Sequence, residues 1–344
     1  MKKNITAGID FGNQTCILSI PTDNGVDIIL NESSNRRTPS FVGYQEGRRT
    51  SGESAQQQQM ISISNTITQL KRLVGLQFNS PECQKLIKEV PFQIICLKDG
   101  SAGIKLDNNE VLHVEQIVSY YLQSLLEIIK KKYPNIEQIV MTIPPNWTEI
   151  QRRSLLNSAL ISNIKISKLL DTSLASAISY VKIHGDRLPS DKSNAQNVIF
   201  VEFGDSSMNV SISKLTKSSI QIMSNVTDNS ISGRQFSQIL EEYLIEKVIQ
   251  KYQIDPRGSQ RSMIRFKQAC EKVKKTLSSN PVVLFEVLSL TNDIDVSMPV
   301  KREEFECLIK KLVSQIKEKV EAAIQKAGLT KEEISHVEII GGSS

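Results

Sequence analysis

The chain has 344 residues, 39% apolar and 23% charged, a composition typical of a soluble globular protein long enough for two or more domains. Its net charge of +5, from 42 basic and 37 acidic residues, is too mild to indicate a nucleic-acid-binding surface. No stretch approaches the roughly 18 consecutive apolar residues of a membrane span. We therefore expect neither nucleic acid nor a membrane as a partner.

The cysteines and the first residues of the chain indicate the cellular compartment of the protein. The five cysteines are scattered without a C-x-x-C pair, which is typical of reduced thiols in a core. The opening MKKNITAGID enters strand-like sequence at once and does not fit a signal peptide. We therefore expect a cytoplasmic protein.

The first half of the chain alternates strand and helix patterns. Alternating apolar residues on both sides of Asp10-Phe11-Gly12 predict two strands joined by a tight turn. The elements expected after this hairpin are two strand-like runs around a polar loop at 26–43, a helical region carrying Lys71 at 51–76, an amphipathic helix at 115–133, a buried strand at 136–145 and a helix at 148–162.

The second half begins at a polar stretch with Gly and Pro, 184–197, which we interpret as the best domain boundary. Helices are predicted at 235–251 and 264–279. The second of these has an apolar stripe made of Phe266, Ala269, Cys270, Val273 and Leu277. A second stripe of Glu271, Lys274 and Ser278 is available to a polar ligand, although such a stripe alone is usually a solvated face. The final VEIIGGSS predicts a buried strand running into two glycines, and we expect the chain to continue beyond it.

One motif occurs twice. The run GIDFGNQTCILSI at 8–20 returns as IFVEFGDSSMNVSI at 199–212, with a carboxylate, Phe and Gly in the same register. One copy would be an ordinary hairpin turn, whereas two copies indicate a duplicated unit and two related lobes. Glycine lets a backbone approach a ligand closely, and N–H groups at a turn bind anions. Because a carboxylate there would repel phosphate, a divalent cation such as hydrated Mg²⁺ must lie between them. The pair predicts two hairpins closing on a Mg²⁺–nucleotide.

Other nucleotide-binding signatures are absent from the sequence. It contains neither G-x-x-x-x-G-K-[ST] nor G-x-G-x-x-G. The DFG of protein kinases follows a catalytic loop and a lysine-bearing strand, and no such segments precede residue 10. We do not expect a protein kinase.

Five segments carry a resemblance to a known family: GIDFGNQTC, NESSNRRTPSFVGY, NTITQLKRLVGL, CEKVKKTLSS and VEIIGGSS. In order and spacing, over essentially the whole chain, they resemble the ATPase domain of the seventy-kilodalton heat-shock chaperones. The forms IDFGNQTC, FVEFGDSS, SGRQF and LTNDIDVSMPVKREEFE are more similar to the large hundred-and-ten-kilodalton subfamily, the nucleotide-exchange members.

The resemblance implies an α/β, actin-like and ribonuclease-H-like ATPase fold. It has two lobes, each with an inner subdomain and an outer cap, and a nucleotide cleft between them. The implied first lobe is 1–188, with its inner part at 1–39 and 112–188 and its cap at 40–111. The implied second lobe is 189–344, with its inner part at 192–230 and 310–344 and its cap at 231–309.

The resemblance also implies the site residues for ATP or ADP with Mg²⁺. The catalytic positions are Lys71, Asp10, Glu202 and Thr172, of which Asp10 and Glu202 would face the metal. The nucleotide-contacting positions are Gly12, Asn13, Gln14, Gly204, Ser206, Ser207, Gly233, Arg234, Glu271, Lys274, Lys275, Ser278, Gly341, Gly342 and Ser343.

Several of these positions depart from the family pattern. Thr172 stands where conventional members carry a catalytic glutamate, and Asp171 lies one residue early. Glu202 replaces an aspartate, Asp205 a glycine, and Ser232 the first glycine of a pair, while Asn13 replaces a threonine. Phosphoryl transfer depends on positioning and charge stabilisation. A site with one carboxylate missing and another moved should therefore bind nucleotide better than it hydrolyses it.

These patterns lead to one functional hypothesis and two alternatives. The hypothesis is a weakly hydrolytic ATP-binding domain of a large heat-shock co-chaperone. It would act as nucleotide-exchange factor and holdase with a conventional seventy-kilodalton chaperone, and would bind unfolded polypeptide through C-terminal domains not present in this chain. One alternative is an ATP-hydrolysing chaperone of the same superfamily. The other is a pseudo-ATPase scaffold that no longer binds nucleotide, which Asp205 and Ser232 favour and Asp10 and Lys71 oppose.

Overall fold

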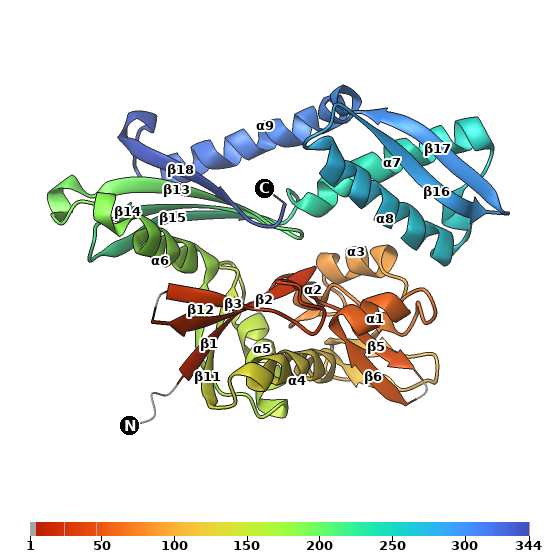
Figure 1. Ribbon diagram of the computed structural model, residues 1–344, viewed down its shortest axis with the longest axis horizontal. Coiled ribbons are helices and arrows are strands. Elements are labelled where there is room, and N and C mark those ends of the chain that lie inside the picture. Colours follow the sequence, from red (N-terminus) through yellow and green to blue (C-terminus); the bar gives the residue numbers. More distant parts are fainter. Residues whose placement is uncertain (1–4, 24, 46, 344) are drawn as a thin grey trace. The chain divides into compact units, whose positions relative to one another are not determined.

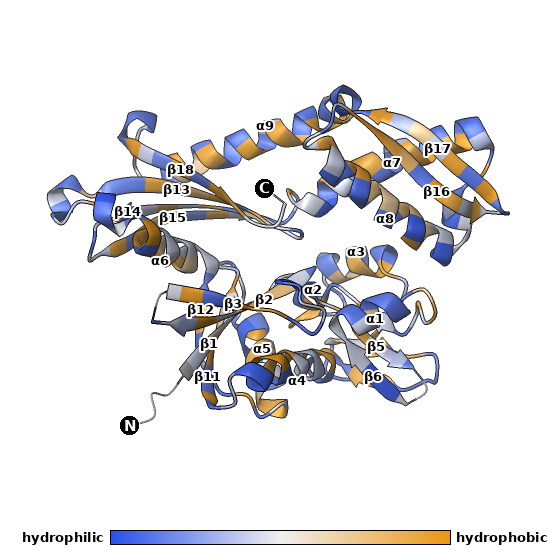
Figure 2. Cartoon of the chain, viewed as in Figure 1, coloured by the Kyte–Doolittle hydropathy of each residue, from blue (hydrophilic) through white to orange (hydrophobic). Residues whose placement is uncertain are grey.

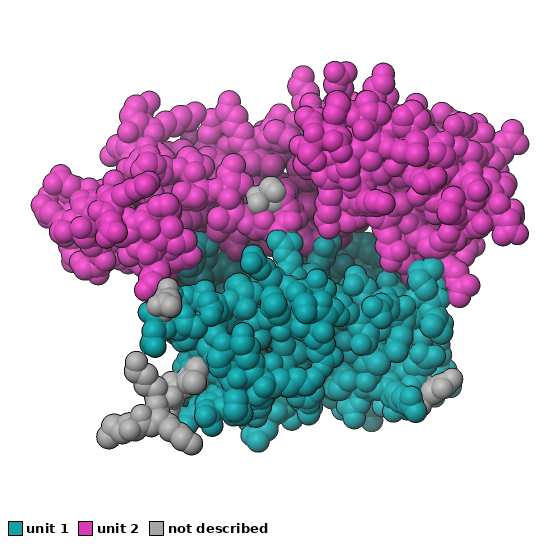
Figure 3. Space-filling model, in the orientation of Figure 1, with its two compact units in different colours: residues 1–176 teal, residues 177–344 magenta. Residues whose placement is uncertain are grey.

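The computed structural model describes residues 5–23, 25–45 and 47–343 (Figure 1). The chain divides into two compact units, residues 1–176 and 177–344, which Figure 3 colours teal and magenta. Helix α6 (Thr172–His184) begins in the first unit and ends in the second. The lobe and subdomain limits inferred from the sequence stay predictions. In the described part of the chain, no helix is both long and apolar enough to cross a membrane.

The first unit is built on a mixed sheet in the order β12-β11-β1-β2-β3, with β4 beside β2. Its strands are β1 (Ile5–Asp10), β2 (Thr15–Thr22), β3 (Gly25–Ile29), β4 (Thr38–Pro39), β11 (Ile136–Ile143) and β12 (Ile166–Asp171). Two smaller sheets contain β5 (Val42–Gln45), β6 (Arg48–Ser51), β7 (Thr66–Ile67), β8 (Gln93–Cys96), β9 (Ala102–Lys105) and β10 (Val111–His113). The helices are α1 (Gly52–Gln58), α2 (Leu70–Leu73), α3 (Pro81–Glu89), α4 (Val114–Lys132) and α5 (Glu149–Ile161).

The pairing of β1, β11 and β12 sets the position of the site. All three run parallel, with Asp10 opposite Thr142 and Ile143 opposite Asp171. Parallel strands end at the same edge of a sheet, which is where ligands bind in many α/β proteins. The residues at the ends of β1 and β12 therefore share that edge.

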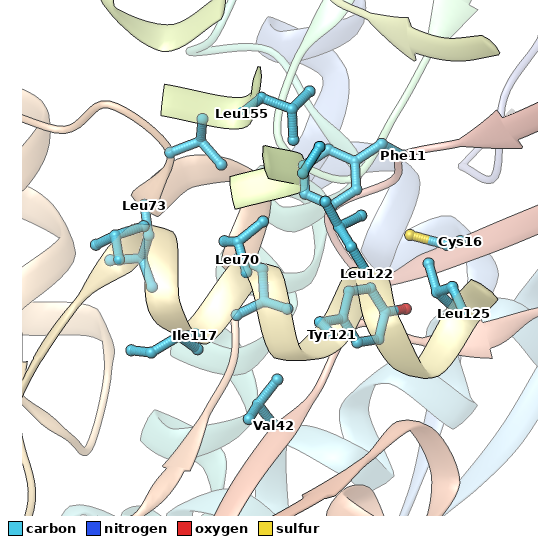
Figure 4. Packing of buried hydrophobic residues seen from close by; sticks show 14 of the residues in the cluster. Phe11, Cys16, Val42, Leu70, Leu73, Ile117, Tyr121, Leu122, Leu125 and Leu155 are labelled. Atoms are coloured by element: carbon cyan, nitrogen blue, oxygen red, sulfur yellow. The ribbon is translucent and has the colours of Figure 1, made fainter. Parts of the chain in front are cut away.

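Apolar side chains of the sheet and of α2, α4 and α5 form the core of the first unit. Phe11 and Tyr121 are fully buried, and Figure 4 shows Phe11, Leu70 and Tyr121 gathered around α4. The Tyr121 hydroxyl donates to the Thr38 carbonyl at 3.2 Å, which satisfies its one polar group. Helix α5 begins at a capping box, because Gln151 N–H donates to Thr148 Oγ1 at 3.3 Å and Gln151 Oε1 accepts from Thr148 N at 3.0 Å.

The helical region expected at 51–76 is wrong as a continuous element. The structure has the short helices α1 and α2, with strand β7 (Thr66–Ile67) between them. The intervening SISNTIT is rich in Ser, Asn and β-branched residues, which favour turns and strands over helix. The helices at 115–133 and 148–162 and the strand at 136–145 are confirmed within a few residues.

The second unit contains a sheet in the order β15-β14-β13-β18 and a separate hairpin, β16–β17. Its strands are β13 (Gln196–Phe203), β14 (Met208–Leu215), β15 (Ile220–Asp228), β16 (Val282–Thr291), β17 (Ile294–Lys301) and β18 (Ile334–Ile340). Its helices are the end of α6, α7 (Gly233–Tyr252), α8 (Gln260–Leu277) and α9 (Arg302–Lys326), with short 3₁₀ turns at Gly185–Arg187, Lys192–Asn194, Pro256–Gly258 and Lys331–Glu333.

Helices cover both faces of the second sheet. Val198 and Phe200 of β13 pack with Tyr180 of α6, whereas the alternating Ile199 packs in a cluster with Leu312 of α9. Along β17 of the separate hairpin, hydrophobic and hydrophilic residues alternate (Figure 2). The buried side chains of this hairpin, among them Phe285 and Val296, pack in one cluster with the predicted apolar stripe of α8.

The last strand differs from its expected burial. The strand itself is confirmed as β18, which pairs in parallel with β13 at the edge of the sheet. It is not buried, because 56% of Val337 and 65% of Ile339 are exposed. An apolar run alone does not distinguish a central strand from an edge strand.

Candidate functional site

The first predicted hairpin connects β1 to β2 and presents Asp10. The Thr142 hydroxyl donates to Asp10 Oδ1 at 2.7 Å and accepts from the Phe11 N–H at 3.3 Å, so it orients the carboxylate from the neighbouring strand. A Cβ on Gly12 would lie 2.1 Å from the Thr15 carbonyl oxygen. Only glycine fits this turn, as expected of a backbone kept open at a binding loop. The Gln14 carbonyl accepts from Ser40 N at 2.8 Å and closes the loop.

A side-chain network connects this hairpin to the segment carrying Lys71. The buried Asn13 donates from Nδ2 to Gln69 Oε1 at 2.8 Å, and Arg72 Nη1 donates to the same oxygen at 3.3 Å. Gln69 has a left-handed φ of 60° and precedes α2, whose second residue is Lys71. The sequence did not single out Gln69, and only its position two residues before Lys71 could have suggested it.

At the end of β12, Thr172 and Asp171 have different environments. Thr172 is buried, and its carbonyl accepts from the Ser176 hydroxyl at 2.9 Å at the start of α6. Asp171 Oδ1 pairs with Arg152 Nη2 at 3.0 Å. Its charge is therefore already compensated by a guanidinium. Asp171 does not supply a second uncompensated carboxylate at this edge.

The second hairpin connects β13 to β14 and is bound to the start of α7. Gly204 N donates to the Ser207 carbonyl at 3.0 Å, which closes the turn that contains Ser206. Gly233 N and Arg234 N donate to the carbonyls of Gly204 and Asp205 at 2.9 and 3.1 Å. Glu202 lies at the end of β13, opposite Asn209 and Ile340. The hairpin therefore brings the oppositely charged residues Asp205 and Arg234 next to each other.

The turn after β18 packs on the same hairpin. Ser343 N donates to the Phe203 carbonyl at 3.1 Å, and a Cβ on Gly341, whose φ is +112°, would lie 2.3 Å from that oxygen. A Cβ on Gly233 would lie 2.1 Å from Ser343 Oγ. Gly342 lies between Gly341 and Ser343, the two residues of this turn that make these contacts. The predicted site residues 204, 233 and 341–343 thus come together, although they are far apart in sequence.

The polar stripe of α8 forms a network with α7. Glu271 Oε2 accepts from the Ser237 hydroxyl at 2.8 Å and pairs with Lys274 Nζ at 2.7 Å, while the more exposed Lys275 lies 3.3 Å from Glu271 Oε1. Burial raises the pKa of Glu271, but Lys274 and the Ser237 hydrogen bond outweigh it and the net pKa is lowered. Ser278 lies just past the helix, at its C-cap. The sequence did not single out Ser237, and only its position four residues after Gly233 could have suggested it.

The residues present fit a nucleotide with Mg²⁺. The loops at Gly12 and Gly341 have no room for a side chain, and Asp10 is exposed. The Ser232 hydroxyl at the start of α7 is buried with no hydrogen-bond partner among the described residues, so a polar group remains for a ligand at that helix terminus. Within residues 5–23, 25–45 and 47–343, no three His, Cys, Asp or Glu side chains form a metal cluster. Mg²⁺ keeps several waters and needs few protein carboxylates, so the assignment to Asp10 and Glu202 stays a prediction.

Comparison with known proteins decides the family. The model of the family described as "Hsp70 protein" matches residues 6–344. This chain belongs to the Hsp70 family. The resemblance seen in the sequence is confirmed, and with it the actin-like fold of the Hsp70 ATPase domain. Hsp70 ATPase domains in general bind ATP or ADP with Mg²⁺.

The individual relatives to which the chain is similar are named as heat shock proteins. The chain is 32% identical over 345 residues to a heat shock protein homolog of Lachancea kluyveri, covering 99% of this chain and 50% of that protein. It is 33% identical over 341 residues to "Heat shock 70 kDa protein 14" of Arabidopsis thaliana, covering 98% and 41%. It is 30% identical over 346 residues to "97 kDa heat shock protein" of Strongylocentrotus purpuratus, covering 98% and 38%. The Hsp70-family chain thus spans half or less of the length of each of these relatives.

Proposed function

We propose that this chain is an ATP-binding domain that hydrolyses ATP weakly and works as part of a nucleotide-exchange factor. The observation that carries the proposal is the edge formed by β1 and β12. Asp10 is oriented there by Thr142, but Thr172 replaces the expected glutamate and Asp171 is paired with Arg152. A group that positions or stabilises charge in such a site raises the rate of the chemical step about 10²–10³-fold. We therefore expect this edge of the sheet to bind ATP better than it hydrolyses ATP.

The binding residues divide by the part of the ligand they would contact. The loops at Gly12 and Gly204 would bind phosphates through backbone N–H groups, and Lys71 would add a positive charge. Glu271 and Lys274 would hold the nucleoside through hydrogen bonds, with Ser237 fixing both side chains. Mg²⁺, when bound, would neutralise phosphate charge beside the carboxylates of Asp10 and Glu202.

The exchange role is proposed from the resemblance of the chain to the large heat-shock subfamily. The heat shock protein homolog of Lachancea kluyveri and the 97 kDa heat shock protein align with nearly the whole chain, and the second-unit segments SGRQF and LTNDIDV resemble the large subfamily. The proposed partner is a conventional seventy-kilodalton chaperone. Binding its open, nucleotide-poor state more tightly than its closed state would speed ADP release. Unfolded polypeptide would bind through further domains of the full-length protein. The five free cysteines support a reducing compartment such as the cytoplasm.

Stopped-flow release of fluorescent ADP from a conventional chaperone of the same organism tests this proposal. The full-length protein loaded with ATP is expected to accelerate release, and Lys71→Met or Asp10→Ala is expected to reduce the acceleration. Release at the spontaneous rate, with the ATP-loaded protein in excess, would instead favour an independent ATP-hydrolysing chaperone.

A further inference from the structure

Helices α7 and α8 are joined by a row of polar contacts. Lys274 Nζ donates to the Gly233 carbonyl at 3.3 Å and to Ser237 Oγ at 2.7 Å, and the Ser237 hydroxyl donates to Glu271 Oε2 at 2.8 Å. Gly233 and Ser237 are four residues apart and lie on one face of α7. From Gly233 to Ser237 on α7, the contacting residue on α8 changes from Lys274 to Glu271, which is earlier in the chain. The two helices therefore run antiparallel here.

The next position in this row is Glu241. It lies four residues after Ser237 on α7, and the antiparallel register places it beside Cys270 and Lys267 on α8. Its neighbours Leu240, Leu244 and Ile245 are buried in the apolar cluster of this unit, and Glu241 is itself partly buried. A carboxyl group therefore extends the polar row towards an apolar core.

Burial raises the pKa of Glu241 to about 7. Lys267 and Lys274 on α8 lower the pKa, while Glu271 on α8 and Glu242 on α7 raise it. The thiol of Cys270 has a pKa raised by burial, so it stays uncharged near neutral pH. Helix α9 meets α7 through apolar side chains, Phe236 and Ile239 packing in a cluster with Ile316. The charges that act on Glu241 therefore come from α8 and from Glu242.

We propose that the charge of Glu241, the next position in this polar row, weakens nucleotide binding at the Glu271–Lys274 face, and that protonation of Glu241 therefore strengthens it. This inference rests on the proposed function. Ionised Glu241 adds a second negative charge to the row that contains Glu271. This charge reduces the positive potential that Lys274 produces at the same face. ATP and ADP are anions, so removing that charge favours their binding, and bound nucleotide in turn favours the proton. Across a partly solvated protein, one charge is expected to change affinity about threefold to tenfold.

The test measures the affinity of the full-length protein for fluorescently labelled ADP with Mg²⁺ at pH 6, 7 and 8 and constant ionic strength. Affinity of the unmodified protein is expected to fall about threefold to tenfold from pH 6 to pH 8. Glu241→Gln, which is always uncharged, is expected to keep the tighter affinity and lose most of this dependence. Glu246→Gln, the same change at an exposed position of the same helix, is the matched control and is expected to behave like the unmodified protein. The phosphates of the ligand titrate equally in all three proteins.

A second readout needs no nucleotide. A carboxyl group with a raised pKa in the folded state loses its stability contribution as pH rises from its ordinary range to about 7. Glu241→Gln is therefore expected to melt above the unmodified protein at pH 8 and with it at pH 5. Equal pH dependence of ADP affinity in the unmodified and Glu241→Gln proteins would overturn this proposal alone. Absence of ADP and ATP binding at every pH would overturn the proposed function as well.

Discussion

Arg152 Nη2 lies 3.0 Å from Asp171 Oδ1 at the carboxyl end of β12, one residue before the buried Thr172. From sequence alone, Asp171 could have been a displaced replacement for the missing glutamate. The ion pair argues against that role, because the guanidinium of Arg152 compensates the charge of this carboxylate and holds it in a fixed direction. Of the described carboxylates at the ends of β1 and β12, that of Asp10 is the one not paired with a guanidinium.

The first prediction concerns the missing carboxylate. Thr172→Glu is expected to raise the single-turnover rate of ATP hydrolysis about tenfold or more, because charge-positioning groups contribute about 10²–10³ in such sites. Adding Glu202→Asp is expected to raise it further. Thr172→Gln, similar in size but uncharged, is the control and should leave the rate unchanged. Hydrolysis by the unmodified protein as fast as by a conventional family member would show that Thr172 is not the limiting departure.

The second prediction concerns the charges beside the second hairpin. Arg234 N donates to the Asp205 carbonyl, so a cation and an anion are adjacent on neighbouring backbone segments. Asp205→Gly is expected to strengthen Mg²⁺–ATP binding, and Arg234→Ala to weaken it, each about tenfold. The double variant should lie near the unmodified protein because the two effects oppose each other, and any departure from their sum measures the coupling between the adjacent charges. Titration with a fluorescent nucleotide measures this, and unchanged affinity in Asp205→Gly would show that the carboxylate points away from the phosphates.

The third prediction is a pH dependence from Glu271. Lys274 and Ser237 lower its pKa against the opposing effect of burial, so the ionised form is favoured in the folded protein. Its stabilising contribution is present above its ordinary pKa of 4.5 and lost as pH falls through the lowered value. Chemical denaturation should find Glu271→Gln less stable than the unmodified protein at pH 6 and equal to it near pH 3. Glu306→Gln, at an exposed position, is the control and should track the unmodified protein throughout. If Glu271→Gln differed from the unmodified protein by the same free energy of unfolding at pH 3 and pH 6, the loss of stability would not be electrostatic.

The fourth prediction concerns the core that supports the first hairpin. Leu125 is fully buried on α4 in the cluster that contains Phe11. Leu125→Ala is expected to destabilise the first unit by about 2–5 kcal/mol through lost burial and a residual cavity. Leu160→Ala, on α5, removes the same atoms from a side chain that is 77% exposed and should cost less than about 0.5 kcal/mol. Thermal unfolding of the two variants measures the contrast, and similar losses would show that the core is packed differently.

Local pattern was enough to predict the elements that carry the site. The turns at Gly12 and Gly204 were predicted because alternation and turn residues are encoded within a few positions. The apolar stripe of α8 was predicted because its period repeats along one helix. The polar network was not predicted. Asn13 and Gln69 are 56 residues apart, and Ser237 and Glu271 are 34 apart, so their pairing depends on how the chain packs. The same holds for the pairing of Asp171 with Arg152, which decides its role.

Calorimetric titration of the full-length protein with ATP in the presence of Mg²⁺ tests the central claim most directly. A one-to-one binding heat is expected that is lost in Asp10→Ala and weakened in Lys71→Met, with little ATP hydrolysed during the titration. No binding heat at millimolar Mg²⁺–ATP, together with an unchanged melting temperature, would contradict it and identify the chain as a scaffold that no longer binds nucleotide.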